Sequence, residues 1–478
     1  MIHPRLRCAV VWVFVCFGVA AHAQNLPLQT TTLRVQANEG APDLQCQVKR
    51  PPARPQRPAE ADTPDVPDEE DVKSQLQAFL ASPEGRSSRS SQTADRGIWP
   101  SLRGQPLRVG IWGDSHLAAA FFTQELQRLS KLSSEQMRSR FVPASMNRPG
   151  VRLPLRKSCL GPNWEYEPAH AGAMGAAQPG PGLVNVSTRH DGAWLSLDVR
   201  NAAGQSDKKS VRFLYQQTAQ PILLAIRVDD AAEQRVELQG TAGPAKLDLV
   251  SDEPLSTVYV RVIQGPWRLH GLEWAVPSEV RLQMDVFGYP GATVAGWRQV
   301  DAQDLLAWRE PSAYDVVVLA FGTNEGNVQP FDGVAYTHML QAAVASWRQA
   351  FPGTACLLIA PGDRGVLVPR ASKPAGQGAD RSPPSRAPDF LRFTRVHAEI
   401  GRVQKQVARA HGCHFWSMFD AMGGAGGAYR WARQTPPLMA RDLIHFTVPG
   451  YQRLAQLMAQ DLGWNAELFQ SGPPPARR

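Results

Sequence analysis

Three residues with side chains suited to nucleophilic chemistry follow one another just after a short apolar run. The stretch VGIWGDSH begins at Val109, and Asp114, Ser115 and His116 end it with a carboxylate, a hydroxyl and an imidazole. The pattern predicts a strand followed by a helix. A helix N-terminus offers unpaired N–H groups and a partial positive charge, which favours negative charge developing beside the serine. The alternative is that Asp114 or Ser115 only caps this helix.

Two other segments place potential oxyanion donors after predicted strands. One strand runs into FGTNEG, so Asn324 can offer its side-chain amide at the strand end. Another runs into GYPGATVAGW, where Gly291 lacks a side chain and can bring its backbone N–H close to a substrate. Taken alone, each residue is more often simply part of a turn.

The stretch RDLIHFTVPGYQRL pairs a carboxylate with an imidazole. Asp442 and His445 lie three residues apart, just before a predicted final helix. A turn at this spacing lets the carboxylate meet Nδ1 of the imidazole, fix its tautomer and leave Nε2 free as a base. Together the segments supply a nucleophile, a base, its orienting carboxylate and oxyanion donors. We therefore predict that Ser115 attacks a carbonyl carbon.

These residues need a scaffold that gathers strand ends. Five apolar runs alternate with helical patterns, and the runs begin at residues 107, 285, 316, 356 and 413. Helices are expected over 117–132, 297–309, 333–350, 393–407 and 451–458. This alternation predicts an α/β fold with a mostly parallel five-stranded sheet between two helical layers. In such sheets the chemistry gathers at the carboxyl ends of the strands.

Residues 183–276 show a different pattern. Seven short runs with alternating polar and apolar residues follow one another, with turn residues between them: WLSLDV, SVRFLYQQ, PILLAIRV, QRVELQG, KLDLVSD, STVYVRVIQ and WRLHGLEWAV. They predict a β-sandwich or jelly roll inserted after the first α/β unit. We place this inserted domain at 166–278 and the two parts of the α/β domain at 101–165 and 279–466.

The ends of the chain are predicted to lie outside these domains. Residues 1–23 combine two arginines, an apolar stretch and the small-x-small triplet AHA, as in a cleaved signal peptide, so the chain is expected to be periplasmic or secreted. That stretch is too short for a membrane span, and no later segment suits a stable transmembrane anchor. Residues 24–100 are expected to be a leader with a Pro-rich linker at 50–72, and 467–478 a loose tail.

Four cysteines remain once the signal is removed. They are Cys46, Cys159, Cys356 and Cys413, and an oxidising compartment allows them to form disulfides. If the strands that begin at Cys356 and Cys413 are neighbours, these two sulfurs can meet; the alternative is two buried free cysteines. The chain has no C-x-x-C pair, which argues against a zinc site.

The composition restricts the class of partner. The chain has 478 residues, 43% of them hydrophobic and 20% charged, enough for two or three folded domains. The net charge of +8 would suit an acidic polymer or an anionic membrane surface, or it reflects a basic surface with no specific partner. No basic stripe with interleaved aromatic residues is present, so we expect no nucleic-acid partner.

The blocks GDS at 113–115, a glycine at 291, G-x-N at 322–324 and D-x-x-H at 442–445 occur in the order found in one superfamily. The chain thus resembles the SGNH (GDSL-like) hydrolases over roughly residues 105–465. WGDSH, FGTNE, the ending DxxHFT-x-x-GY and the inserted β domain are similar to the periplasmic peptidoglycan O-acetylesterases of Gram-negative bacteria. His116 and Glu325 depart from the common superfamily residues but agree with this narrower group.

The resemblance implies a three-layer, flavodoxin-like hydrolase fold and a role for each site residue. Ser115 would be the nucleophile, His445 the general acid and base, and Asp442 its orienting partner. The oxyanion hole would use the N–H groups of Ser115 and Gly291 and the Asn324 amide, with Asp114 and His116 as possible support.

No metal or organic cofactor is expected. The expected substrate is an O-acetyl ester on the C6 oxygen of N-acetylmuramic acid in peptidoglycan, or on another acetylated glycan. The insert resembles a carbohydrate-binding module, in which Trp194, Trp267 and Trp274 would serve as sugar platforms or as core residues.

Three alternatives remain open at the level of sequence. The same triad could transfer the acetyl group to another sugar instead of to water. It could act on acetylated xylan or an exopolysaccharide. In a different class, the chain could be a non-catalytic wall-binding protein with a disused site, which the complete set of catalytic residues argues against.

Overall fold

The computed structural model describes residues 28–38, 43–44, 46, 66–87, 96–102, 104–172, 178–300, 305, 314–367 and 388–470. The predicted signal peptide, most of the predicted linker and the last eight residues of the predicted tail lie outside these ranges. Among the described residues, no helix combines the length and apolar character needed to cross a bilayer.

A parallel sheet forms the middle layer of the α/β part. It has six strands, in the order β18 (His414–Ser417), β17 (Ala355–Ala360), β16 (Val316–Ala320), β2 (Leu107–Gly113), β15 (Leu282–Gly288) and β3 (Met137–Arg138). Every neighbouring pair in it is parallel. The five strands predicted from the sequence are present, and the two-residue strand β3 is an addition that is too short to be recognised as a pattern.

The strands are apolar on both faces because both faces are covered. In β16 the buried residues alternate: Val316 and Val318 join one hydrophobic core, and Val317 and Leu319 join the other. This explains the continuous apolar run in the sequence.

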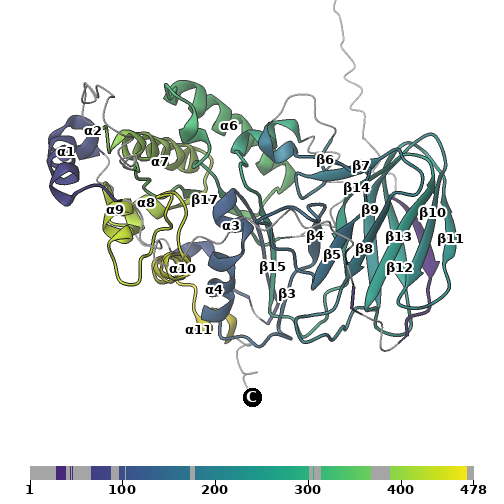
Figure 1. Cartoon of the computed structure of the whole chain (residues 1–478). Helices are drawn as coiled ribbons and strands as arrows, with labels where there is room; N and C mark the ends of the chain where they lie inside the picture. Colours follow the sequence, from purple (N-terminus) through teal and green to yellow (C-terminus); the bar gives the residue numbers. More distant parts are fainter. Residues whose placement is uncertain are drawn as a thin grey trace, which may run out of the picture.

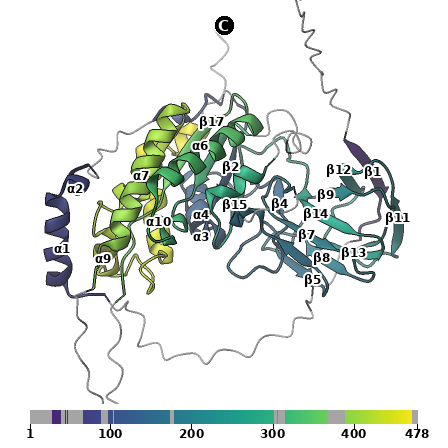
Figure 2. The same cartoon turned by 90° about the horizontal axis from the view of Figure 1, so that it is seen from above.

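One face is covered by α6 (Gly333–Ala350) and α7 (Arg392–Ala410), which lie side by side, and the opposite face by α4 (Phe121–Leu129) and α10 (Val448–Leu462) (Figures 1 and 2). The remaining helices of this part are short: α3 (Ser115–Ala118), α8 (Met418–Ala421), α9 (Gly427–Ala432), α11 (Ala466–Gln470) and the 3-10 turns η2 (Arg96–Ile98), η4 (Val294–Gln299) and η5 (Glu325–Asn327).

Two further sheets lie at one end of the molecule (Figure 1). A seven-stranded sheet runs in the order β1 (Gln29–Arg34), β12 (Gly243–Val250), β9 (Ser210–Gln217), β14 (Trp267–Glu273), β7 (Asn185–Thr188) and β6 (Glu165–Glu167), with β4 (Phe141–Pro143) also paired to β14. A five-stranded antiparallel sheet runs in the order β11 (Gln234–Leu238), β10 (Ile222–Val228), β13 (Thr257–Gln264), β8 (Trp194–Asp198) and β5 (Lys157–Leu160). A 3-10 turn, η3 (Ala169–Ala171), follows β6.

The two sheets share one apolar core. Phe213 and Leu247 of the seven-stranded sheet are buried in the same cluster as Leu224 and Val260 of the five-stranded sheet. The seven runs predicted as strands all form strands, because their alternating pattern gives each sheet one apolar face. Trp267 and Trp274 also belong to this cluster, so they are core residues and not sugar platforms.

Three short strands lie close to the domain boundary predicted at residue 165. Strands β4 and β5 lie within the range 101–165 assigned to the α/β domain, and β6 begins at its last residue, but all three pair with strands of the other two sheets. These strands have only three or four residues, so no periodic pattern marks them, and their pairing is decided by long-range contacts.

The helix predicted over 117–132 is wrong in one respect, because it is interrupted. Ala120 separates α3 from α4 with a φ of 64°, a left-handed conformation that ends one helix and redirects the chain into the next. The 3-10 turn η4 (Val294–Gln299) overlaps the start of the stretch predicted as a helix at 297–309.

The leader and tail are more structured than predicted. Residues Gln29–Arg34 form β1, which pairs in parallel with β12. Helix α1 (Glu69–Ala81) begins inside the predicted linker and buries Val72 and Phe79 against the α/β core; α2 (Pro83–Ser87) follows it. In the predicted tail, Phe469 of α11 is buried. In both views α1 lies at the end of the molecule opposite β11 (Figures 1 and 2).

Candidate active site

Three neighbouring strands of the parallel sheet end at the same level. Gly113 at the end of β2 is paired with Gly288 at the end of β15 and with Ala320 at the end of β16. The loops that follow these strands carry Ser115, Gly291 and Asn324. The register therefore places three of the predicted site residues along one edge.

Ser115 is the first residue of α3. The Asp114 carboxylate caps this helix, since its Oδ1 accepts a hydrogen bond from the His116 N–H at 3.0 Å. A Cβ on Gly113 would lie 2.5 Å from the Ala320 carbonyl oxygen, so only glycine fits at this turn. The residue that caps α3 thus comes directly before the serine that begins it.

The Asp442–His445 segment forms a tight turn. Asp442 Oδ1 accepts hydrogen bonds from the N–H groups of Ile444 and His445, each at 2.9 Å. Asp442 Oδ2 accepts a hydrogen bond from His445 Nδ1 at 2.7 Å. Leu443 between them has a φ of 54°, which directs both side chains to the same side of the turn.

This turn meets the serine from the other end of the chain. His445 Nε2 lies 2.8 Å from Ser115 Oγ, although 330 residues separate them. Because Nδ1 faces a carboxylate it holds the ring proton, and Nε2 is left to accept the hydroxyl proton of Ser115. Such a chain can convert a serine hydroxyl into a nucleophile.

The electrostatics of the pair favour an ionised Asp442. Burial disfavours the charge, but the hydrogen bonds from the His445 ring and from the His445 and Ile444 N–H groups outweigh it and hold the pKa of Asp442 well below its usual range. The hydrogen bond to Asp442 raises the pKa of His445; burial opposes this rise, and the negative charges of Asp442 and Asp114 add to it.

The predicted oxyanion donors lie on the same edge. Among the described residues, no acceptor is present for the N–H groups of Ser115 and Gly291. Gly291 has a φ of 81°, and a Cβ there would meet nothing within 4 Å, so its backbone faces open space. Asn324 Nδ2 donates one hydrogen bond to the Ala292 carbonyl at 2.8 Å, which ties the two loops together and leaves its second N–H.

Glu325 is buried directly beside this edge. Its Oε1 accepts a hydrogen bond from the Val294 N–H at 2.9 Å, whereas Oε2 has no partner among the described residues. Burial raises the pKa of Glu325 to about 7; the bond from Val294 opposes this shift, and the charge of Asp114 adds to it. The residue therefore fixes the loop after Gly291 to the loop that carries Asn324.

His116 packs beside the His445 imidazole. Its ring is buried 5.4 Å from that of His445 and shares a hydrogen bond of 3.2 Å between Nδ1 and the Tyr451 hydroxyl. Burial lowers the pKa of His116. Its ring also lies 5.2 Å from that of Phe446, so the residue is part of an aromatic wall.

Arg364 was not recognised from the sequence. It follows β17, and its neighbour Gly365 donates a backbone hydrogen bond to the Leu443 carbonyl at 3.0 Å. Its Nη1 donates to Asn327 Oδ1, and its guanidinium lies 3.8 Å from the centre of the Phe393 ring. The Arg364 side chain and the Gly365 backbone thus together link the loop of Asn324 to the turn of His445. The available signal was its place at the carboxyl end of a fourth strand, in CLLIAPGDR.

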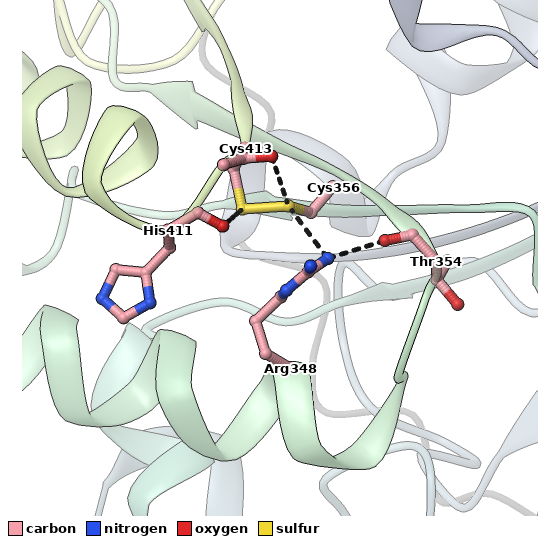
Figure 3. Close-up of a disulfide and its surroundings, with 6 residues drawn as sticks. Arg348, Thr354, Cys356, His411 and Cys413 are labelled. Atoms are coloured by element: carbon pink, nitrogen blue, oxygen red, sulfur yellow. Dashed lines mark hydrogen bonds between the residues drawn. A yellow bond between two sulfur atoms is a disulfide. The ribbon is translucent and has the colours of Figure 1, made fainter.

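The cysteines form two disulfides. Cys356 is bonded to Cys413, which joins β17 to the residue before β18 (Figure 3). Nearby, Arg348 Nη1 donates to the Thr354 carbonyl at 2.7 Å (Figure 3). Cys46 is bonded to Cys159 of β5, a pairing that the sequence did not predict because four cysteines allow several connectivities.

The described residues include no cluster of three or more His, Cys, Asp or Glu side chains that could hold a metal ion.

Comparison with known proteins gives a consistent result. Residues 265–453 match the GDSL-like Lipase/Acylhydrolase family, a range that includes Gly291, Asn324, Asp442 and His445 and begins after Ser115. No curated protein matches the chain.

A solved structure of a peptidoglycan O-acetylesterase is 22% identical, with a TM-score of 0.56, and the match covers 82% of this chain and 98% of that one. At this identity the likeness shows a shared fold. Two matches have lower TM-scores. A carbohydrate esterase family 2 enzyme with a carbohydrate-binding domain, from Corynascus thermopiles (Myceliophthora fergusii), is 11% identical, with a TM-score of 0.23 and coverage of 58% and 96%. The salicylyl-acyltransferase SsfX3 is 15% identical, with a TM-score of 0.23 and coverage of 64% and 96%.

The family match over residues 265–453 and the shared fold support the same conclusion: the chain carries a GDSL-like lipase/acylhydrolase domain, as expected of a hydrolase with esterase activity.

Proposed function

We propose that this esterase removes O-acetyl groups from peptidoglycan, specifically from the C6 oxygen of N-acetylmuramic acid, by a serine mechanism. The observation that carries the proposal is the hydrogen-bonded chain Ser115–His445–Asp442, with distances of 2.8 and 2.7 Å at the carboxyl edge of the sheet. This geometry is that of a serine nucleophile, its base and the residue that orients the base.

The reaction proceeds in two halves. Ser115 Oγ attacks the acetyl carbonyl carbon while His445 Nε2 takes the hydroxyl proton, and the tetrahedral intermediate collapses when His445 returns that proton to the sugar oxygen. The sugar leaves with its free hydroxyl, and the acetyl group stays on Ser115. A water molecule, deprotonated by His445, then cleaves this ester and releases acetate.

Negative charge on the acetyl oxygen needs donors in place before the reaction begins. The N–H groups of Ser115 and Gly291, which have no acceptor among the described residues, and the Asn324 amide are the donors assigned here. Loss of one such donor costs on the order of 10²–10³ in rate. Asn324→Ala should therefore lower the reaction rate by more than the loss of side-chain packing alone would.

The substrate assignment is supported by the sequence blocks shared with peptidoglycan O-acetylesterases. The fold likeness to the solved structure of such an enzyme supports it further, since that match covers 82% of this chain. The predicted signal peptide and the two disulfides suit a periplasmic or secreted protein, the compartment in which peptidoglycan is found.

The two additional sheets are proposed to form the inserted carbohydrate-binding domain. Trp194 on β8 is half-buried and stacks on Tyr259 of β13, with the ring centres 5.9 Å apart and an interplanar angle of 29°. The Arg227 guanidinium lies 5.1 Å from the centre of the Tyr259 ring. Aromatic faces with a hydrogen-bond donor beside them suit sugar rings, so this pair is the platform we assign.

Acetate release tests the proposal. The purified protein should liberate acetate from O-acetylated peptidoglycan without any added acceptor, and do so faster than from acetylated xylan at equal acetyl content. The Ser115→Ala variant should release none. If acetate is released only from xylan, the assignment of peptidoglycan as the substrate is wrong. If acetyl groups are transferred only to an added sugar, the enzyme is an acetyltransferase and not a hydrolase.

A further inference from the structure

A concave feature lies apart from the Ser115 edge. It is a groove of about 1240 Å³ between the parallel sheet and the two additional sheets. Gln124 of α4 and Arg138 of β3 line one side, and residues of the segments 145–158 and 200–208 line the other. None of the residues assigned to catalysis lines this groove.

The groove is nevertheless connected to the catalytic edge by one loop. Arg152 donates its backbone N–H to the carbonyl of Ala118, the last residue of α3, at 2.8 Å. A Cβ on Gly150 would lie 3.8 Å from Pro290, the residue before Gly291. The loop that forms one wall of the groove therefore starts beside the nucleophile helix and the oxyanion loop.

The lining of the groove is strongly basic. Seven basic residues line it, Arg138, Arg148, Arg152, Arg156, Lys157, Arg200 and Lys208, against three acidic ones, Glu135, Asp207 and Glu279. Four of the seven have acidic partners. Asp207 pairs with Arg138 at 2.6 Å and with Lys208 at 3.5 Å, while Asp198 pairs with Arg200 at 2.6 Å and with Arg156 at 3.3 Å.

The other three cations of the wall form no ion pair among the described residues, although the charge of Lys157 acts on Asp43. The Arg148 guanidinium is held 3.9 Å from the centre of the Tyr166 ring, and Lys157 Nζ donates to the Leu44 carbonyl at 2.6 Å. Arg152 is exposed, with no ion pair. Arg148 and Arg152 belong to the part of the wall nearest the catalytic edge.

A buried hydroxyl gives an independent indication of a ligand. Ser145 lines the same groove and is only 1% exposed, yet its Oγ has no hydrogen-bond partner among the described residues. Buried polar atoms are rarely left without a partner in folded proteins. A bound polar group would satisfy it.

We propose that this groove binds carboxylate groups of a polyanionic glycan while Ser115 acts on an acetyl ester of the same chain. The inference rests on the proposed function and narrows its substrate class. Peptidoglycan carries stem peptides that end in carboxylates, whereas acetylated xylan of the unsubstituted type is neutral. Guanidinium groups bind carboxylates through paired, charge-assisted hydrogen bonds, so Arg148 and Arg152 distinguish these polymers.

Sedimentation with insoluble polymer tests the groove without turnover. In a Ser115→Ala background, the double variant Arg148→Gln/Arg152→Gln should bind peptidoglycan at least about tenfold more weakly than the parent. Added salt of about 0.5 M should weaken the binding of the parent protein to peptidoglycan to a similar degree, because salt screens exposed charges. Insoluble neutral xylan should sediment little of either protein.

The matched control is Arg235→Gln/Arg409→Gln. Both residues are exposed, on β11 and α7, and line no part of the groove, while the change in net charge is identical. This control should bind peptidoglycan within about twofold of the parent. If the groove variant does not fold, as judged by circular dichroism, the single Arg152→Gln change replaces it.

The outcomes separate the two proposals. If the groove variant binds peptidoglycan as tightly as the parent, or if the control loses as much affinity as the groove variant, the proposal that the groove binds carboxylates is wrong. Acetate release by the active protein is measured in parallel, and its absence with O-acetylated peptidoglycan overturns the substrate assignment. Binding that still depends on Arg148 and Arg152 in that case retains the groove as a site for anionic glycans.

Discussion

At the scale of residues, the site depends on side chains that satisfy one another's hydrogen bonds. Asp442 orients His445, His445 meets Ser115, and Asp114 fixes the helix that starts at the serine. Arg364 lies between the loop of Asn324 and the turn of His445. Substitutions at these residues therefore give separate predictions.

The first prediction concerns the proposed catalytic chain. Ser115→Ala and His445→Ala should each lower kcat for a small acetyl ester by at least about 10³-fold, and the double variant should be little worse, since the two residues act as a unit. The melting temperature of Ser115→Ala should stay within about 2 °C of the wild type. Turnover near the wild-type value in either variant would refute the assigned role.

The second prediction concerns the pH profile. His445 must be neutral to act as a base, so kcat/KM should fall as the pH drops through its raised pKa. The positive charge of Arg364 lowers that pKa. Arg364→Gln should therefore move the acidic limb of kcat/KM to higher pH, by about half a unit.

Arg364→Lys is the matched control for this experiment. It keeps the charge, so its acidic limb should stay closer to that of the wild type. An unchanged limb in Arg364→Gln would show that the guanidinium does not act on His445.

The third prediction concerns Glu325. Its folded-state pKa of about 7 lies above the ordinary 4.5, so the folded protein holds this proton better than the unfolded chain does. The stability due to Glu325 is thus fully present below pH 4.5 and is lost as the pH rises through 7. Glu325→Gln keeps an acceptor for the Val294 N–H and cannot ionise.

Relative to the wild type, Glu325→Gln should gain about 2 kcal/mol in the free energy of unfolding between pH 5 and pH 8. Urea denaturation at both pH values measures this difference. Glu325→Ala, which removes the acceptor, should be less stable than the wild type at pH 5. A pH-independent difference between Glu325→Gln and the wild type would place the carboxylate in contact with solvent.

At the scale of elements, strand register and short turns position the site. The pairing of Gly113 with Gly288 and Ala320 aligns three strand ends, and the left-handed Ala120 separates α3 from α4. The opposite edge of the sheet is held by the Cys356–Cys413 disulfide, at the amino ends of β17 and β18.

The fourth prediction tests that disulfide. The Cys356→Ser/Cys413→Ser variant should lose about 2–4 kcal/mol of unfolding free energy, because the bond closes a long loop in the unfolded chain. Its turnover of a small ester at 25 °C should remain within about twofold of the wild type, since the bond lies at the edge away from Ser115. Equal stability of the variant and the wild type in denaturant would contradict the expectation.

At the scale of the whole molecule, the N-terminal segment joins parts that are distant in sequence. Strand β1 adds to the edge of the seven-stranded sheet, Cys46 is bonded to Cys159 of the five-stranded sheet, and α1 packs on the α/β core. The predicted leader therefore contributes to the cores of the molecule.

The fifth prediction follows from β1. Deleting residues 28–38 removes Val35 and Leu33 from the core between the two additional sheets and should cost about 2–4 kcal/mol. It also exposes the edge of β12, which favours association between copies. Thermal unfolding and size-exclusion chromatography measure both effects. A monomeric deletion variant with the wild-type melting temperature would show that β1 adds no stability.

The periodic elements, and the polar residues at their ends, could be predicted from the amino-acid pattern alone. A continuous apolar run such as VVVLAF predicts a strand that is buried on both faces, and an alternating run such as TVYVRVI predicts a strand with one apolar face. Both follow because each buried face needs apolar residues at a fixed spacing. The predictions of Ser115, Asp442 and His445 came from their places beside such runs.

Which distant segments meet could not be predicted in this way and is seen only in the folded chain. No local pattern indicates that β4 pairs with β14, that Cys46 reaches Cys159, or that Arg364 lies between the loops of Asn324 and His445. These contacts depend on packing and on the closure of long loops, and their free energy is gained only once the chain has folded.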